Sequence, residues 1–154
     1  MTVPQAAQLQ RRIKAKLRPP APLFRILNRG KERFECPICG YEGPFADVSS
    51  FAGKRVHAVC PSCGALERHR LQYLVVKDLL GEIDADAMKM LHFAPEKVLT
   101  KALSQKFLAY ETADLFMKGV DHAADVRKLP VADGSYDLCL PLMCSSTSGK
   151  TYKR

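Results

Sequence analysis

The chain has 154 residues, of which 47% are apolar and 26% charged, a composition typical of a protein that folds in water. Residues 1–33 hold nine Lys or Arg against the single acid Glu32, and this balance of +8 equals the net charge of the whole chain. The N-terminus lacks the apolar core of a secretory signal, and the apolar runs are too short to span a bilayer. These features predict a cytoplasmic protein without a membrane span. In a reducing compartment, paired cysteines favour a metal over a disulfide.

Residues 1–33 form a basic arm. Ala6 to Leu17 could form a short helix, which Pro19 and Pro20 would end. One interpretation is that the arm contacts nucleic acid or another anionic surface. The other is a solvated, partly disordered extension, which is supported by the lack of aromatic residues among the charges before Phe24.

The most specific chemical signal is a pair of cysteine knuckles. They read Cys36-Pro37-Ile38-Cys39-Gly40 and Cys60-Pro61-Ser62-Cys63-Gly64. This spacing is typical of a tetrahedral zinc site with four thiolate ligands, Cys36, Cys39, Cys60 and Cys63. Four protein ligands leave no open position, so the predicted Zn²⁺ is structural, and residues 34–64 are expected to form a small zinc ribbon of short strands and turns.

Alternatives to this ligand set stay open. The cysteines could be free or form disulfides, and His57 could replace a cysteine as ligand or be an ordinary packing residue. His69 has the same ordinary interpretation. Cys139 and Cys144 have no partner knuckle and are predicted not to bind the metal.

Residues 65–87 connect the ribbon to the C-terminal half of the chain. The pattern predicts a helix from Ala65 to Leu80 that Gly81 stops, with an apolar stripe formed by Leu71, Leu74, Val75 and Leu79.

From residue 88 the pattern changes to strands that alternate with helices. We expect strands at about 88–93, 108–112, 121–126 and 136–140, and a helix from Pro95 to about Lys106. Such alternation predicts a parallel α/β sheet.

The loops after these strands carry acids. Ligands of parallel α/β sheets bind at the carboxyl ends of the strands, where His92 to Glu96 would form the first turn. Asp114 follows the second strand, where an acid can accept ribose hydroxyls. Asp125 follows the third expected strand, where an acid can accept the amino group of an adenine. Each acid alone could be a solvated loop residue, but together they favour an adenosine site.

Several motifs resemble a known family. Leu66-Glu67-Arg68-His69-Arg70 follows the knuckles, then come Leu91-His92-Phe93-Ala94-Pro95-Glu96, Thr112-Ala113-Asp114-Leu115, and the run from Ala124 to Leu138. Over residues 34–138 the chain resembles class I S-adenosylmethionine-dependent methyltransferases that carry an N-terminal zinc ribbon. The resemblance implies a Rossmann-like sheet over residues 88–138, a transfer of a methyl group to an unknown acceptor, and a cofactor site formed by His92, Phe93, Ala94, Glu96, Asp114, Asp125 and Val126.

In this resemblance Asp114 would bind the ribose, and Asp125 with Val126 would frame the adenine. Residues 92–96 would lie beside the methionine moiety. One departure is that Phe93, Ala94 and Pro95 replace the usual glycine-rich loop, so the backbone would lie farther from the cofactor. No catalytic base can be named from the sequence.

After Leu138 the family pattern stops, and residues 139–154 form an aberrant tail. One permitted codon choice for Cys139 to Lys153, read two bases later, encodes Phe-Ala-Ser-His-Val-Leu-Glu-His and six further residues, which is what the family would place there. We therefore expect a shifted reading frame, with natural divergence as the alternative. The expected sheet is then incomplete, half of it being absent, and this chain is predicted to bind S-adenosylmethionine weakly or not at all. A different function remains possible, that of a non-enzymatic zinc-ribbon module whose basic arm binds nucleic acid.

Overall fold

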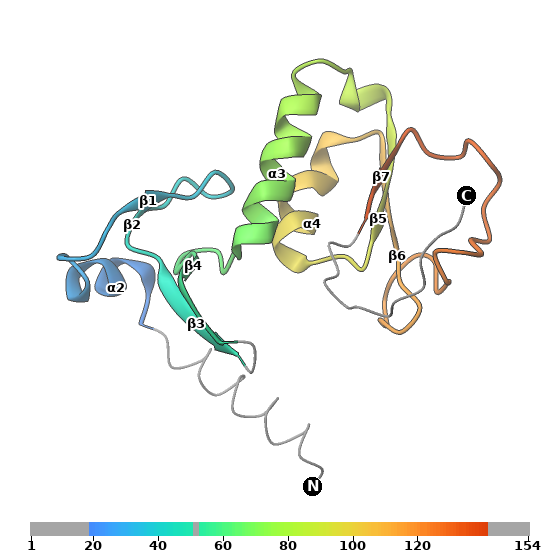
Figure 1. Ribbon diagram of the computed structural model, residues 1–154. Coiled ribbons are helices and arrows are strands. Elements are labelled where there is room, and N and C mark those ends of the chain that lie inside the picture. The colour runs from blue at the N-terminus through green and yellow to red at the C-terminus, as the bar shows by residue number, and fades with distance from the viewer. Residues whose placement is uncertain (1–18, 51–52, 142–154) are drawn as a thin grey trace, which may run out of the picture. The chain divides into compact units, whose positions relative to one another are not determined.

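The computed structural model describes residues 19–50 and 53–141, and it divides the chain into two compact units, Met1–Val76 and Lys77–Arg154 (Figure 1). The helix predicted over residues 6–17 and the tail residues 142–154 lie outside the described residues.

The first unit consists of one short helix and two small antiparallel sheets. Its elements are α2 (Ala21–Leu27), β1 (Phe34–Glu35) with β2 (Glu42–Gly43), and β3 (Ala46–Ser50) with β4 (Gly53–Val59). Pro22 lies in the first turn of α2, where its missing N–H has no helical partner to lose. The short strands and turns expected between the two knuckles are therefore present.

The apolar core of this unit is small. Ala46, Ala58 and Val59 are buried, and Phe24, Val48 and Leu66 pack against them. Phe45 is buried as well, but the other buried apolar side chains are small, so the core contributes less free energy to folding than that of a larger domain. A unit of this kind needs a further source of stability, which a metal can supply.

Helix α3 (Glu67–Leu80) follows the second knuckle, close to its predicted range, but its predicted apolar stripe is wrong. Leu71 and Val75 are 55% and 60% exposed, and Leu74 is also exposed. The buried residues of the helix are His69, Gln72 and Val76, and Nδ1 of His69 accepts a hydrogen bond from the Leu66 N–H at 3.2 Å.

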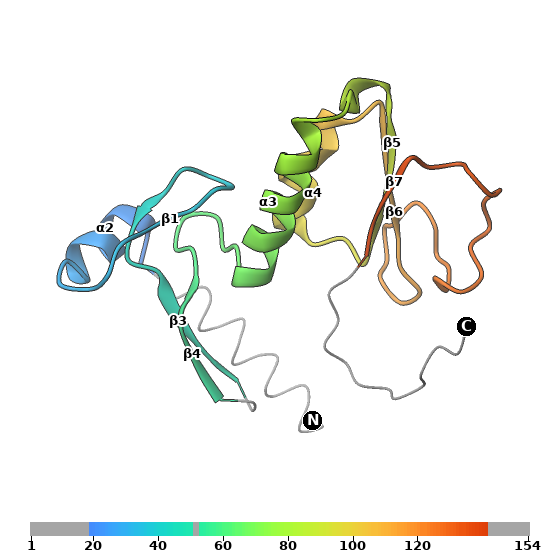
Figure 2. The same ribbon diagram turned by 45° about the horizontal axis from the view of Figure 1, so that its top comes forward.

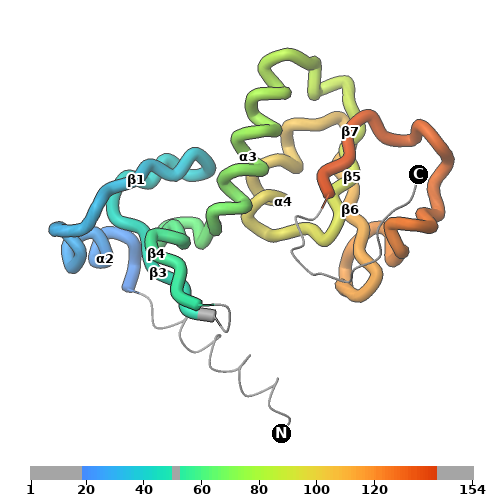
Figure 3. The backbone as a smooth tube through the Cα atoms, viewed as in Figure 1, coloured from blue at the N-terminus to red at the C-terminus, as the bar shows by residue number. Residues whose placement is uncertain are grey.

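The second unit contains a three-stranded parallel sheet. In chain order its elements are η1 (Ala85–Ala87), β5 (Lys89–Phe93), α4 (Lys97–Leu103), η2 (Ser104–Lys106), β6 (Ala109–Ala113) and β7 (Leu138–Leu140). The strand order is β6-β5-β7, and β5 pairs in parallel with both neighbours. Figures 2 and 3 show that the chain leaves β6 through a long loop and returns to the other side of β5. The predicted parallel α/β arrangement is confirmed for these three strands, whereas a Rossmann-like methyltransferase sheet stays a prediction.

The core of the second unit lies around β5 and α4. Met90, Leu91, Leu99 and Leu103 are fully buried. Side chains of adjacent residues point to opposite faces of a strand, so burial of Met90 and Leu91 requires cover on both faces of β5. Buried, near-continuous apolar runs of this kind are typical of parallel sheets, and they explain why the sequence pattern predicts this strand correctly.

The strand predicted over residues 121–126 is wrong. Only isolated bridges occur there, one between Ala113 and His122 in parallel and one between Asp125 and Lys128. The carboxylate of Asp121 explains the interruption, since it accepts hydrogen bonds from the N–H and hydroxyl of Thr112 at 2.8 and 2.6 Å. A side chain therefore occupies a backbone donor that a regular strand would have used.

The longest helix in the described part of the chain, α3, has 14 residues, and no helix there has both the length and the apolar character that a bilayer crossing requires.

Candidate functional site

The four predicted metal ligands lie together in the first unit. The sulfur atoms of Cys36, Cys39, Cys60 and Cys63 are all within 4.8 Å of one another. The Sγ–Sγ distances are 3.7 Å both for Cys36 with Cys63 and for Cys39 with Cys60. Tetrahedral zinc with Zn–S bonds near 2.3 Å requires sulfur atoms about 3.8 Å apart. The four cysteines are thus positioned to bind a metal ion, and they fit structural zinc.

The two knuckles use the same backbone geometry. The Cys36 N–H donates to the Tyr41 carbonyl at 2.9 Å, and the Cys60 N–H donates to the Ala65 carbonyl at the same distance. Gly40 and Gly64, which have φ values of 66° and 78°, donate their N–H groups to the carbonyls of Cys36 and Cys60. Only glycine adopts this φ without strain, so the glycine after each second cysteine is what makes the turn close.

The electrostatics of the cluster also favour a cation. Burial raises the pKa of the Cys60 thiol to about 11, and the neighbouring Cys36 adds to the shift. Burial, followed by the hydrogen bond with Cys39, likewise raises the pKa of Cys63. Neighbouring thiolates repel one another, so the sulfurs cannot all lose their protons without a positive ion between them.

Histidines are not part of this group. Within residues 19–50 and 53–141 the four cysteines are the only group of three or more metal-binding side chains. The ring of His57 lies 5.0 Å from that of Phe34, centroid to centroid, and the backbone N–H of His57 donates to Oδ1 of Asp47 at 3.1 Å. Both His57 and His69 therefore have the ordinary packing role, and Cys139 is not a ligand of the cluster.

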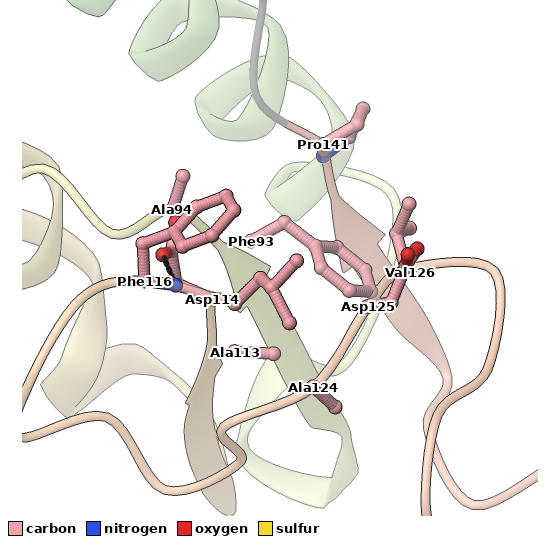
Figure 4. Close-up of a pocket in the computed structure, with 10 residues that line it drawn as sticks. Phe93, Ala94, Ala113, Asp114, Phe116, Ala124, Asp125, Val126 and Pro141 are labelled. Carbon is pink, nitrogen blue, oxygen red and sulfur yellow. Dashed lines mark hydrogen bonds between the residues drawn. The ribbon is translucent and has the colours of Figure 1, made fainter.

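A second candidate site is a cavity of about 530 Å³ in the second unit (Figure 4). This volume lies within the usual range of small-molecule sites, roughly 300–1,000 Å³. It opens at the carboxyl ends of the strands, since Phe93 ends β5, Ala113 ends β6 and Pro141 follows β7. Strand β6 follows β5 in the chain and lies on one side of it, whereas β7 lies on the other side. Parallel sheets bind ligands at the point where the strand order reverses in this way.

The cavity brings together five of the seven predicted cofactor-binding residues. They are Phe93, Ala94, Asp114, Asp125 and Val126. Figure 4 shows the Phe93 ring between the two aspartates, whose carboxylates lie on opposite sides of it in this view. The walls are otherwise apolar, so a ligand here would have a flat, apolar body with polar groups at its edges.

The two carboxylates are held in different ways. Oδ1 of Asp114 accepts hydrogen bonds from the N–H groups of Phe116 and Met117, both at 2.7 Å. Asp125 instead pairs with the guanidinium of Arg127, which lowers the pKa of Asp125 to about 2. Both acids are therefore positioned by contacts within the long segment between β6 and β7.

His92 and Glu96 do not line the cavity. His92 is 2% exposed, and its Nδ1 forms a hydrogen bond with the hydroxyl of Tyr110, which also donates to Thr100 at 3.5 Å. Burial lowers the pKa of His92 to about 4, although the charge of Glu96 acts in the opposite direction. The imidazole is thus neutral at pH 7 and belongs to a polar contact between the sheet and α4. Glu96 is the residue that precedes α4.

Ala94 has a backbone conformation that is usually adopted by glycine. Its φ is 45°, in the left-handed region, and its N–H donates to the carbonyl of Ala113 at 2.8 Å. The chain therefore makes the tight turn after β5 without a glycine, at the cost of backbone strain.

Sequence reasoning missed several residues around the cavity. Leu115, Phe116 and Pro141 form part of its walls, and Phe116 is 89% exposed. A signal existed for the first two, because they directly follow Asp114. Pro141, by contrast, lies in the segment that departs from the family pattern.

A polar cluster outside the cavity was also missed. Oε2 of Glu111 accepts hydrogen bonds from the hydroxyl of Tyr136 and from Nε2 of His122, both at 2.6 Å. The three residues come from β6, the loop after it and the segment before β7, so no local pattern could have brought them together.

Comparisons with known proteins give no relative: no family model, no curated protein and no solved structure matches this chain.

Proposed function

We propose that the second unit is the cofactor-binding part of an S-adenosylmethionine-dependent methyltransferase and that the first unit is its structural zinc ribbon. The observation that carries the proposal is the cavity at the ends of β5, β6 and β7. Its lining is mostly apolar, and Asp114 and Asp125 lie on opposite sides of the Phe93 ring (Figure 4). An adenosine has the matching chemistry, because a flat base would lie against apolar side chains while ribose hydroxyls and the base amino group face carboxylates.

In this proposal Asp114 accepts the ribose hydroxyls and Asp125 accepts the amino group of the adenine. Phe93 and Val126 contact the flat faces of the base, and the turn at Ala94 lies beside the rest of the cofactor. The cofactor supplies an electrophilic methyl group on a sulfonium, and the protein contributes mainly by orienting the two reactants. These residues define neither the methyl acceptor nor a general base.

The four-cysteine cluster has a structural role in this proposal. Four thiolates complete the coordination of a zinc ion, so no position is left for water or substrate. The ion would instead stabilise a unit whose apolar core is small.

A titration of the protein with S-adenosylhomocysteine, followed by backbone amide NMR signals, tests this function. The incomplete sheet predicted from the sequence allows weak binding or none, and the cavity favours weak binding, with shifts at residues 93–94, 114–116 and 125–126. Asp114→Asn should weaken the affinity by about tenfold, because a charged hydrogen bond to a hydroxyl contributes roughly 1.5 kcal/mol. Asp137→Asn serves as a control, since the Asp137 carboxylate accepts a hydrogen bond from the Lys89 N–H away from the cavity. Equal affinity of Asp114→Asn and the unmodified chain would count against this role of Asp114.

A second candidate is nucleic-acid binding by the first unit. One observation favours it: Arg25, Arg29, Lys31 and Arg33 are all exposed next to the first knuckle. Binding through such residues is mainly electrostatic, so it should weaken steeply as salt increases. Fluorescence anisotropy with a short single-stranded RNA and with a duplex DNA, at 50 and 200 mM salt, checks this. Affinity that does not change with salt would contradict it.

A further inference from the structure

We infer that Arg127 limits ligand binding in the cavity by competing for the carboxylate of Asp125. The inference rests on the proposed function and concerns how that site is regulated. It assigns Arg127 a positioning role, since the residue acts on a ligand through Asp125.

The contacts of Asp125 carry the inference. Its Oδ1 accepts hydrogen bonds from the backbone N–H and Nε of Arg127 at 2.9 and 3.0 Å. Its Oδ2 accepts from Nε and Nη2 of the same arginine at 3.1 and 2.5 Å. A carboxylate has about four lone-pair positions. Three N–H groups of one residue, the Nε–H being shared between both oxygens, therefore occupy most of the acceptor positions that a ligand would need, and two of the three belong to the guanidinium.

Asp114, on the other side of the cavity, differs in this respect. Both of its hydrogen bonds, from the Phe116 and Met117 N–H groups, go to Oδ1. In the part of the chain that the structure describes, Oδ2 accepts none. One acid can thus bind a donor as it stands, whereas the other must first give up part of its contact with Arg127.

Arg127 can leave without unfolding the unit. Its side chain is 85% exposed, and that of Asp125 is 29% exposed. Ion pairs between such groups are screened by solvent and change an equilibrium only a few-fold. A ligand amino group can therefore displace the guanidinium, and the competition lowers the affinity by about twofold to fivefold.

The competition has a distinctive dependence on salt. Adenosine is neutral near pH 7, so no net charge of the ligand makes its own binding depend on salt. Salt weakens the exposed pair of Arg127 and Asp125. The affinity of the unmodified chain for adenosine should therefore increase with ionic strength, which is opposite to the behaviour of an electrostatically attracted ligand.

Lys128 offers a matched control. It lies next to Arg127 and has the same charge, but its hydrogen bond with Asp125 joins backbone atoms, from its N–H to the Asp125 carbonyl at 2.9 Å. Replacing it changes the net charge equally and leaves the carboxylate contacts in place.

The experiment is an NMR titration of the full chain with adenosine, comparing the unmodified protein with Arg127→Met and Lys128→Met at 50 and 500 mM salt. Arg127→Met should bind about twofold to fivefold more tightly at low salt and should show no salt dependence. Lys128→Met should behave like the unmodified chain. Amide spectra of both variants without ligand that differ from that of the unmodified chain only near the substituted residue establish that they fold.

Two outcomes would overturn the inference, and only the second would also overturn the proposed function. If adenosine shifts the cavity residues equally in Arg127→Met and the unmodified chain, Arg127 does not compete, and the proposed function stands. If adenosine shifts no cavity residue in any variant at millimolar concentration, both the inference and the proposed function are wrong.

Discussion

Single residues determine how the turn after β5 is made. Ala94 has a φ of 45°, a conformation that costs a residue with a Cβ roughly 1 kcal/mol relative to glycine. Ala94→Gly should therefore increase the free energy of unfolding by about 0.5–1 kcal/mol, measured by urea denaturation. Ala123→Gly is the control, because Ala123 has no positive φ and should lose stability on the same change. A loss of stability in both variants would show that relief of strain at Ala94 does not outweigh the entropy that glycine adds to the unfolded chain.

The carboxylate of Glu111 gives a prediction about pH. The hydrogen bond from Tyr136, and then that from His122, lower the pKa of Glu111 below its ordinary value. A carboxyl with a lowered pKa contributes stability that is present above its ordinary pKa, near 4.3, and is lost as the pH falls through the lower value of the folded state. Unfolding of the second unit should thus become easier as the pH falls below about 4.

Removing one donor should reduce this effect. Tyr136→Phe is expected to raise the pKa of Glu111, as followed by the NMR shift of its side-chain carboxyl carbon during a pH titration. Tyr73→Phe, which changes a tyrosine on α3, should leave that pKa where it is. If Glu111 has the same pKa in Tyr136→Phe and Tyr73→Phe, the hydrogen bond from Tyr136 does not stabilise its carboxylate.

At the scale of elements, the paired knuckles are expected to depend on a metal for their stability. Their strands are short and the buried residues beside them are mainly alanine and valine. Zinc binding in such small sites contributes roughly 10–16 kcal/mol, more than this core can supply. We expect one zinc ion per chain by mass spectrometry of the native protein, and loss of the β3 and β4 amide signals when a strong chelator removes it.

Variants of single cysteines test which thiols matter. Cys36→Ser removes a fully buried ligand and should abolish zinc binding and the folded signals of this unit. Cys139→Ser, which changes an exposed thiol outside the cluster, should leave zinc content at one per chain. Zinc retained in full by Cys36→Ser would mean that the metal is bound elsewhere.

The elements also show what the sequence could predict. The knuckles are predictable because each depends on local spacing, two cysteines and a glycine within five residues. Strand β5 is predictable because buried parallel strands have short apolar runs, whereas β6 contains Glu111 and Thr112 and is buried only at Ala113. The stripe on α3 was predicted wrongly, since periodicity identifies an apolar face but not whether that face meets a partner. Here the buried face is that of His69, Gln72 and Val76.

The same limit applies to the candidate site. Asp114 follows from the rule that ligands bind at the carboxyl ends of strands. The same rule predicts Asp125 from a strand over residues 121–126 that does not form, yet both acids line one cavity. His92 appeared equally promising, but its burial and its contact with Tyr110 depend on the packing of α4. The sequence also could not predict the pairing of Asp125 with Arg127. Whether two side chains so close in sequence meet depends on the conformation of the turn between them.

For the whole molecule, the division into two compact units predicts independent unfolding. Chelation of the metal should remove amide signals from residues 34–66 and leave those of β5, β6 and β7 unchanged. Hydrogen exchange measured with and without chelator checks this, since protection of the sheet should not change. A loss of protection throughout both units would show that they fold as one cooperative structure.

The central claim is that the cavity of the second unit binds an adenosyl cofactor, and an amide NMR titration with S-adenosylhomocysteine tests it most directly. The predicted result is weak binding, with the shifts confined to Phe93, Ala94, residues 114–116 and residues 125–126. Shifts confined to residues 34–66, or no shifts at millimolar ligand, would contradict the claim.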